Sequence, residues 1–377
     1  MAGIYIHYPF CKQACTYCNF HFSTSLKKQN VMIEAMLKEI ELRNRFFDNE
    51  IINSIYFGGG SPSLLTTKSI EIFILRIKKT FNVSSLVEVT VELNPDDSSN
   101  EYLNGLKDIG VNRISVGIQS FIEEDLNLMK RAHSSDQAFG SIEDVKSLFE
   151  NFSIDLIYGL PNSNVDRWMY NLKTTLSYSP PHISCYALTV EPKTLLQKQI
   201  ASGEVLVIDE NIVEKQYLNM LDYLDENNYD NYEFSSFAKS GKYSVNNSGY
   251  WEGMPYMGIG PSAHSYNGID KRSWNINKNS IYIKSINENK LPLKEEYLSL
   301  KDKFNEMIMI GLRTSAGVSL EKIKSKVGNK FAYYLEENSK KRILSNDLYW
   351  DGDHLHVSKK SKFLSDGIAS DLFIIDL

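Results

Sequence analysis

The sequence has no long apolar run, no excess of basic residues and few cysteines. The run IEIFILRI at residues 70–77 is interrupted by charges and is too short to span a bilayer. No basic segment with a small-residue cleavage site opens the chain, so we expect no secretory signal and a cytoplasmic location. The 47 acidic residues outnumber the 41 basic ones, which disfavours nucleic acid as a partner.

Three of the four cysteines lie within eight positions, in CKQACTYC at residues 11–18. In a reducing compartment such a cluster is more typical of a metal site than of disulfides. A structural zinc site would need a fourth ligand, for which His7 or His21 is available. An iron–sulfur cluster held by three thiolates would keep one iron open to another molecule. Cys185, alone in a predicted strand, is expected to be a small buried apolar residue.

Short β-rich runs alternate with amphipathic helical segments over the first 235 residues. This alternation predicts a parallel sheet with helices outside it. We expect an α/β fold, an incomplete (β/α)6 barrel of the TIM type, over residues 1–235. The six predicted strands are GIYIHYPF, IINSIYFGGG, LVEVTVELNP, RISVGIQSF, FSIDLIYGLP and HISCYALTVEP.

The remaining residues predict two further segments. Residues 236–290 are rich in Gly, Asn and Tyr with few helix signals, so we expect a cap or long linking loop. Residues 291–377 return to helical patterning, and Asp351-Gly352 between two apolar runs indicates a hairpin. Helices followed by a hairpin predict a small helical, winged-helix-like domain. A packing role is favoured over DNA binding because the chain is acidic overall.

Polar residues stand at or near the ends of several predicted strands. Glu92, Gln119 and Asp155 lie in the third, fourth and fifth strands, and the glycine run 58–60 ends the second. Chemistry in a parallel barrel is carried by the loops at the carboxyl ends of its strands. For Glu92, Gln119 and Asp155 the alternative is a buried polar group with a purely structural role. For the glycines it is an ordinary turn. Arg131, which follows the fourth strand and its helix, could be a solvated charge at a helix end.

Several motifs in order resemble the radical S-adenosylmethionine (SAM) superfamily. They match the branch that contains oxygen-independent coproporphyrinogen III oxidase and the HemW heme chaperones. The matching stretches are YIHYPFC, GGGSPS, ELNP, RISVGIQSF, DLIYGLP, YALTVEP and GIGPSAH. The resemblance implies a [4Fe-4S] cluster on Cys11, Cys15 and Cys18, with SAM on its open iron. It also implies SAM contacts from Tyr5, Gly59, Gly60, Ser61, Glu92, Gln119, Arg131, Asp155 and Ala187.

Two departures from the oxidase favour the HemW family. The oxidase motif continues with a further Cys two residues after the third, where this chain has Phe20. The oxidase also carries an N-terminal extension ahead of the cluster, for which we expect no counterpart here. The prediction is therefore a heme chaperone that passes heme to an unknown acceptor protein. The alternatives are oxidative decarboxylation of porphyrin propionates, and a zinc-stabilised binding protein that uses no SAM.

The heme site is the least defined part of this resemblance. HemW proteins carry an H-N-x-x-Y-W segment linked to heme, and this chain reads NNSGYW, with Asn246 in place of the histidine. Asn247, Tyr250 and Trp251 match, and His264 is a second candidate for contact with heme. Because Asn is a poor ligand for heme iron, Tyr250 becomes the ligand candidate in the segment. The alternative is that Tyr250 and Trp251 only anchor a loop.

Overall fold

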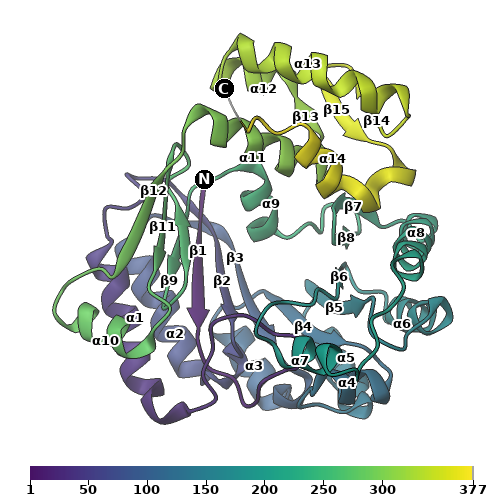
Figure 1. The fold of residues 1–377 in the computed structure, drawn as a ribbon. Coiled ribbons are helices and arrows are strands. Elements are labelled where there is room, and N and C mark those ends of the chain that lie inside the picture. Colours follow the sequence, from purple (N-terminus) through teal and green to yellow (C-terminus); the bar gives the residue numbers. More distant parts are fainter. Residues whose placement is uncertain (376–377) are drawn as a thin grey trace. The chain divides into compact units, whose positions relative to one another are not determined.

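A computed structural model describes residues 1–375 of the chain, which divide into two compact units (Figure 1). The larger unit comprises Met1–Gln216 and Ser244–Glu296. The smaller unit comprises residues 217–243 and residues 297–375. These limits differ from the boundaries predicted at 235 and 290, because residues 217–243 belong with the C-terminal segment. No helix within the described residues combines the length and apolarity needed to cross a membrane.

The larger unit is built on six parallel strands that neighbour one another in chain order, which confirms the incomplete barrel. They are β1 (Ala2–Tyr8), β2 (Ile52–Gly59), β3 (Val83–Leu93), β4 (Arg113–Gln119), β5 (Phe152–Tyr158) and β6 (His182–Ala187). The connecting helices include α1 (Gln29–Leu42), α2 (Thr67–Thr80), α3 (Asn100–Asp108), α4 (Glu123–Met129), α5 (Ser135–Leu148) and α6 (Val165–Ser177).

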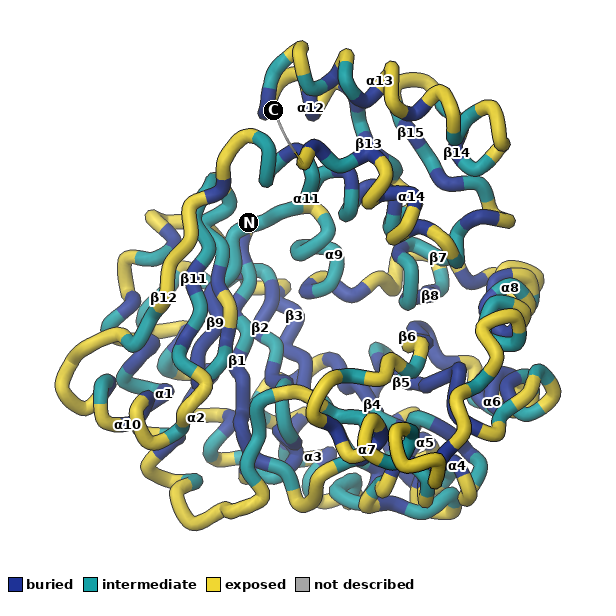
Figure 2. Tube along the Cα trace, viewed as in Figure 1, coloured by how far each residue is buried: buried dark blue, intermediate teal, exposed yellow. Residues whose placement is uncertain are grey.

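Side chains alternate between the two faces of these strands. On β1, Ile4 and Ile6 are fully buried, whereas Tyr5 between them is only partly buried. Apolar positions on the following strands repeat the pattern, and Figure 2 shows the strands as the most buried part of this unit. Since successive residues of a strand point to opposite sides, the second face is left for polar side chains. Cys185 on β6 is 1% exposed, as predicted for a small apolar residue.

The prediction of a long loop over residues 236–290 was wrong. This segment forms α9 (Val245–Glu252), β9 (Tyr256–Ile259), β10 (His264–Tyr266), β11 (Lys271–Asn275) and α10 (Asn279–Asn287). β9 pairs in parallel with β1, and β10, β11 and β12 (Leu293–Tyr297) extend the same sheet. The strands are too short to give a period in the sequence. A side chain on Gly258 would collide with the backbone of His264, which explains the glycine in β9.

A buried carboxylate fixes these added strands to the barrel. Glu39 of α1 accepts hydrogen bonds from the Gly260 amide at 2.9 Å, the Asn275 amide group at 2.7 Å and the Tyr282 hydroxyl at 2.6 Å. The guanidinium of Arg43 lies 3.2 Å away and also donates to the Gly258 carbonyl. With four polar partners, the Glu39 charge is compensated inside the protein.

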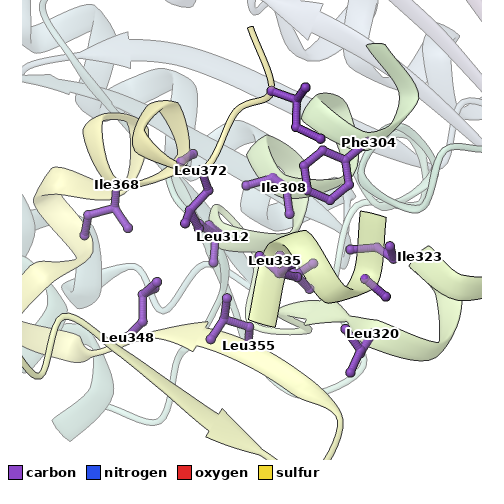
Figure 3. Close-up of a cluster of buried hydrophobic side chains, with 14 of the residues drawn as sticks. Phe304, Ile308, Leu312, Leu320, Ile323, Leu335, Leu348, Leu355, Ile368 and Leu372 are labelled. Atoms are coloured by element: carbon purple, nitrogen blue, oxygen red, sulfur yellow. The ribbon is translucent and has the colours of Figure 1, made fainter. Parts of the chain in front are cut away.

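The smaller unit has the winged-helix-like order that the sequence predicts. Its C-terminal part comprises α11 (Leu300–Leu312), β13 (Val318–Ser319), α12 (Leu320–Lys326), α13 (Asn329–Leu344), β14 (Leu348–Asp351), β15 (His354–Val357) and α14 (Ser365–Asp371). Phe304, Leu335 and Leu355 lie at the centre of its apolar core (Figure 3). Gly352, with φ of 59°, makes the turn between β14 and β15, which confirms the Asp351-Gly352 hairpin. The same unit holds part of α8 (Glu210–Glu226), β7 (Asp230–Glu233) and β8 (Ser236–Ala238).

Candidate functional site

The three clustered cysteines follow β1 on a loop at the carboxyl ends of the strands. The Cys11 amide donates to the Ser23 carbonyl at 3.1 Å, and the Thr16 amide donates to the Met129 carbonyl at 3.0 Å. A loop side chain fixes it further, since Lys12 lies 2.6 Å from a carboxylate oxygen of Asp96. The cysteines are all partly buried and unpaired in disulfides. The loop is therefore tied to its neighbours while its thiols stay accessible.

Cys11, Cys15 and Cys18 line one cavity of about 470 Å³ in the larger unit. Burial, with a smaller effect of the neighbouring Cys18 and Cys15, raises the pKa of Cys11 to about 11, against the opposing effect of the Ser61 hydroxyl. In the described part of the chain, no three His, Cys, Asp or Glu side chains already stand together as a metal-ligand set. The structure thus brings the thiols to a common cavity without gathering them at one point.

Two carboxylates face the same cavity from β3 and β5. Glu92 accepts a hydrogen bond from the Tyr56 hydroxyl at 3.0 Å. Asp155 accepts from Ser115 at 2.8 Å and from Ser153 at 3.0 Å. Burial, with the nearby Asp155 charge, raises the pKa of Glu92 to about 7. Burial also raises the pKa of Asp155, against the three serine hydroxyls around it. This wall can take up a positive charge on a ligand.

Arg131 supplies the opposite charge and is partly buried rather than solvated at a helix end. Its guanidinium donates to the Asn94 side chain at 2.8 Å, to the Gly117 carbonyl at 2.9 Å and to the Cys15 sulfur at 3.6 Å. Its Nε is buried and has no hydrogen-bond partner among the described residues. One cavity therefore contains thiols, carboxylates and a fixed guanidinium.

The glycine run after β2 packs directly on the chain that enters the cysteine loop. The Gly60 amide donates to the Tyr8 carbonyl at 2.8 Å, and the Ser61 amide donates to the Phe10 carbonyl at 2.7 Å. The Gly59 amide hydrogen-bonds to Glu92. A Cβ on Gly60 would collide with the Phe10 carbonyl, and Gly59 has φ of 105°. Glycine is thus required here by close approach and by backbone conformation.

The remaining predicted SAM residues divide into two groups. Gln119, at φ of 66° where β4 shifts register against β5, lines the cavity together with Ala187 at the end of β6. Tyr5 does not belong to the described lining. Its ring instead stacks against that of Tyr56, with centroids 6.0 Å apart.

Sequence reasoning missed several residues of this cavity, including Tyr17, Tyr56, Ser115 and Tyr186. Tyr56 and Ser115 face the cavity from strands beside those of Glu92 and Asp155. Their positions could have been found from alternation, since Tyr56 lies two residues before Gly58 and Ser115 two before Gly117. Tyr186 follows the same rule, because it lies two residues after Ser184 and pairs with Ile157, another residue of the lining. Tyr17 lies on the cysteine loop, where alternation gives no signal.

The segment NNSGYW forms α9 rather than a loop, and α9 packs on β1 and β2. Asn246 is buried. Its backbone N–H donates to the Glu88 carboxylate, and its side-chain oxygen accepts from the Ser54 hydroxyl at 3.4 Å. The Tyr250 ring packs edge-on against Tyr256 with centroids 4.6 Å apart. Asn247 and Trp251 are partly buried on the same helix. None of these residues belongs to the described lining of the cysteine cavity.

His264 differs from the heme candidates on α9 because it is exposed. It begins β10, pairs with Trp274 of β11 and stacks on that ring at a centroid distance of 5.8 Å. Partial burial, together with Arg272, lowers the pKa of His264, which favours the neutral imidazole. A neutral imidazole is the form that binds metals.

The partial barrel and the superfamily match together define a radical SAM protein. The family model described as "Radical SAM superfamily" matches residues 5–173, and the "HemN C-terminal domain" model matches residues 298–364. The solved coproporphyrinogen III oxidase (HemN) of Escherichia coli superposes with a TM-score of 0.85. That alignment covers 99% of this chain and 90% of the enzyme at 20% identity, which shows the shared fold.

Closer relatives are heme chaperones. HemW of Lactococcus lactis is 32% identical over 99% of this chain and 97% of its own length. HemW of Bacillus subtilis is 31% identical over 92% of this chain and 93% of its own length. The chain belongs to the HemW heme chaperone family of the radical SAM superfamily.

Proposed function

We propose that this chain is a cytoplasmic heme chaperone that binds a [4Fe-4S] cluster and SAM and transfers heme to an acceptor protein. The observation that carries the cofactor part is the single cavity into which Cys11, Cys15 and Cys18, Glu92, Asp155 and Arg131 all project. The heme part rests on the family to which the chain belongs.

The donor set fits both cofactors chemically. Three thiolates suit an iron–sulfur cluster and leave one iron for an outside ligand. The carboxylate of Glu92 suits the amino group of SAM, and Arg131 suits its carboxylate. The buried Nε of Arg131 lacks a protein partner among the described residues, so its N–H is a further donor for a ligand carboxylate. When bound, the reduced cluster can supply an electron to SAM.

The protein's own residues would orient these groups. Asn94 and the Gly117 carbonyl hold the Arg131 guanidinium in place, so its charge does not have to be positioned when the ligand arrives. Ser115 and Ser153 hold both oxygens of Asp155. Tyr56 holds Glu92 in the same way.

The test of function measures heme binding and porphyrin turnover on the same protein. After anaerobic reconstitution, we expect added heme to give a shifted Soret band at micromolar protein. We expect coproporphyrinogen III with SAM and a reductant to give no protoporphyrinogen IX. Absence of the Soret shift would remove the chaperone proposal, and formation of protoporphyrinogen IX would establish the oxidase instead.

Among the four residues predicted for heme, His264 is the best placed to bind iron. It is exposed and stacked on Trp274, whereas Tyr250 is packed against Tyr256. We expect His264→Ala to weaken heme binding about tenfold or more and to change the Soret maximum, because an axial ligand is lost. The matched variant Tyr250→Phe removes only a hydroxyl and should leave both unchanged. The opposite pattern would assign the ligand to α9.

A further inference from the structure

A second cavity lies inside the smaller unit and has no part in the site described above. Its volume is about 150 Å³. Tyr217, Phe234 and Tyr349 supply aromatic walls, while the end of α11, β15 and the 3₁₀ helix Lys359–Leu364 supply polar groups. It is therefore small, partly aromatic and open to a ligand of a few atoms.

The two charged groups and the imidazole in this cavity are all basic. Arg313, His356 and Lys362 all line it, and none of the described residues that line it is acidic. This grouping stands out in a chain whose net charge is −6. Asp366 pairs with Arg313 and Glu233 lies close to the same guanidinium, while Asp225 acts on Lys362 and Asp351 on His356 from outside the lining. Lys362 and His356 lie beyond that pair.

Lys362 is directed toward a neutral partner. Its ammonium donates to the side-chain oxygen of Asn231 at 2.7 Å, which uses one of three available protons. The serine and threonine hydroxyls in the wall are already engaged with backbone carbonyls: Thr314 donates to Gly311 at 3.2 Å, Ser315 to Tyr232 at 3.3 Å and Ser365 to Lys362 at 2.6 Å. The donors left for a ligand are therefore mainly those of Lys362 and His356.

The basic groups of the cavity affect one another's pKa values. Burial lowers the pKa of Lys362, and the neighbouring Lys359 adds to the shift while Asp225 opposes it. Burial likewise lowers the pKa of His356, with His354 and Lys362 adding to the shift against Asp351. The His356 ring stacks on Tyr349 at a centroid distance of 5.4 Å, so it is held in place. A bound anion would offset this repulsion.

We propose that the cavity binds a small oxyanion of the phosphate class through Lys362, His356 and Arg313. The inference concerns the smaller unit alone and is separate from the cluster, SAM and heme. An ammonium, an imidazole and a guanidinium that share one small cavity give the donors that a tetrahedral oxyanion requires. The aromatic walls limit the size of the ligand and shield it from water.

The experiment uses the full-length protein and sodium phosphate at constant ionic strength, followed by calorimetry. We expect saturable binding that is at least about tenfold weaker in Lys362→Met, since a charge-assisted hydrogen bond is lost. Lys330→Met, at an exposed position on α13, is the matched control and should bind like the original protein. Acetate, which tests a carboxylate ligand, should bind more weakly than phosphate.

A second measurement avoids dependence on the folding of the Lys362 variant. In the unaltered protein, NMR titration of His356 should show its pKa rising when phosphate is present, because the bound anion favours the imidazolium. Lack of phosphate binding, equal binding by Lys362→Met, or an unmoved His356 titration would each overturn the assignment. Acetate binding as tight as phosphate would also contradict it.

Discussion

Replacing Cys11, Cys15 and Cys18 together by alanine is expected to abolish iron binding. The reconstituted variant should be colourless and contain neither iron nor sulfide, because three thiolates are the protein's whole contribution to the proposed cluster. Iron and sulfide analysis with visible absorption spectroscopy measures this directly. Since the three side chains are only partly buried on a loop after β1, the folded barrel should survive the change.

Cys185→Ala is the matched control for this experiment. Its sulfur is buried in β6 away from the cavity lining, so the variant should keep its full iron content. Circular dichroism of both variants would show whether the barrel is retained. An unchanged iron content in the triple variant would contradict the cluster proposal, and zinc in place of iron in the original protein would favour the zinc-stabilised binding protein.

Replacing Glu92 by glutamine is expected to weaken SAM binding by about tenfold to a hundredfold. The loss of one charge-assisted hydrogen bond corresponds to about 1.5–3 kcal/mol. Glutamine keeps the shape of the side chain and can still accept from Tyr56, so the effect isolates the charge. Equilibrium binding of SAM to reconstituted protein is the measurement. Glu101→Gln, at an exposed position on α3, is the control.

The raised pKa of Glu92 gives this prediction a pH signature. Burial and the Asp155 charge place that pKa at about 7, so the carboxylate form increases as the pH rises through neutrality. SAM affinity should therefore increase between about pH 6 and pH 8 in the original protein. It should stay nearly constant in Glu92→Gln. The same slope in both proteins would show that another group controls binding.

The stability of the ligand-free protein should decrease over the pH range in which SAM affinity increases. A folded-state pKa above the ordinary value of 4.5 means that the charged form favours the unfolded chain. In the absence of ligand, this group should therefore lower the free energy of unfolding as the pH rises from about 4.5 through 7. In Glu92→Gln, the free energy of unfolding should not show this decrease with pH. Denaturant unfolding at two pH values, with Glu101→Gln beside it, would show the difference.

The barrel could be predicted because its pattern is strong and local. Six apolar runs alternate with amphipathic helices, and the hairpin at Asp351-Gly352 is a two-residue turn signal. The added strands β9, β10 and β11 could not be found in the same way. They are three to five residues long and depend on distant partners, such as Glu39 of α1 contacting Gly260 and Asn275.

Residues of the candidate site could be predicted where their position along a strand decides which way the side chain points. Glu92 and Asp155 face the cavity because their strands alternate and end there. Arg131 was ambiguous in the sequence, since only the tertiary contacts with Asn94, Gly117 and Cys15 show that it turns inward. The burial of Asn246 could likewise not be predicted from the sequence, because it depends on contacts with Ser54 and Glu88 from two different strands.

Three amide protons of the turn after β2 are used within the chain. Gly59, Gly60 and Ser61 donate theirs to Glu92, Tyr8 and Phe10 within the chain. Glycine-rich turns that cradle nucleotides work in the reverse sense, by aiming several N–H groups at phosphate oxygens. We therefore expect this turn to favour ligands that bring hydrogen-bond donors of their own over polyphosphates.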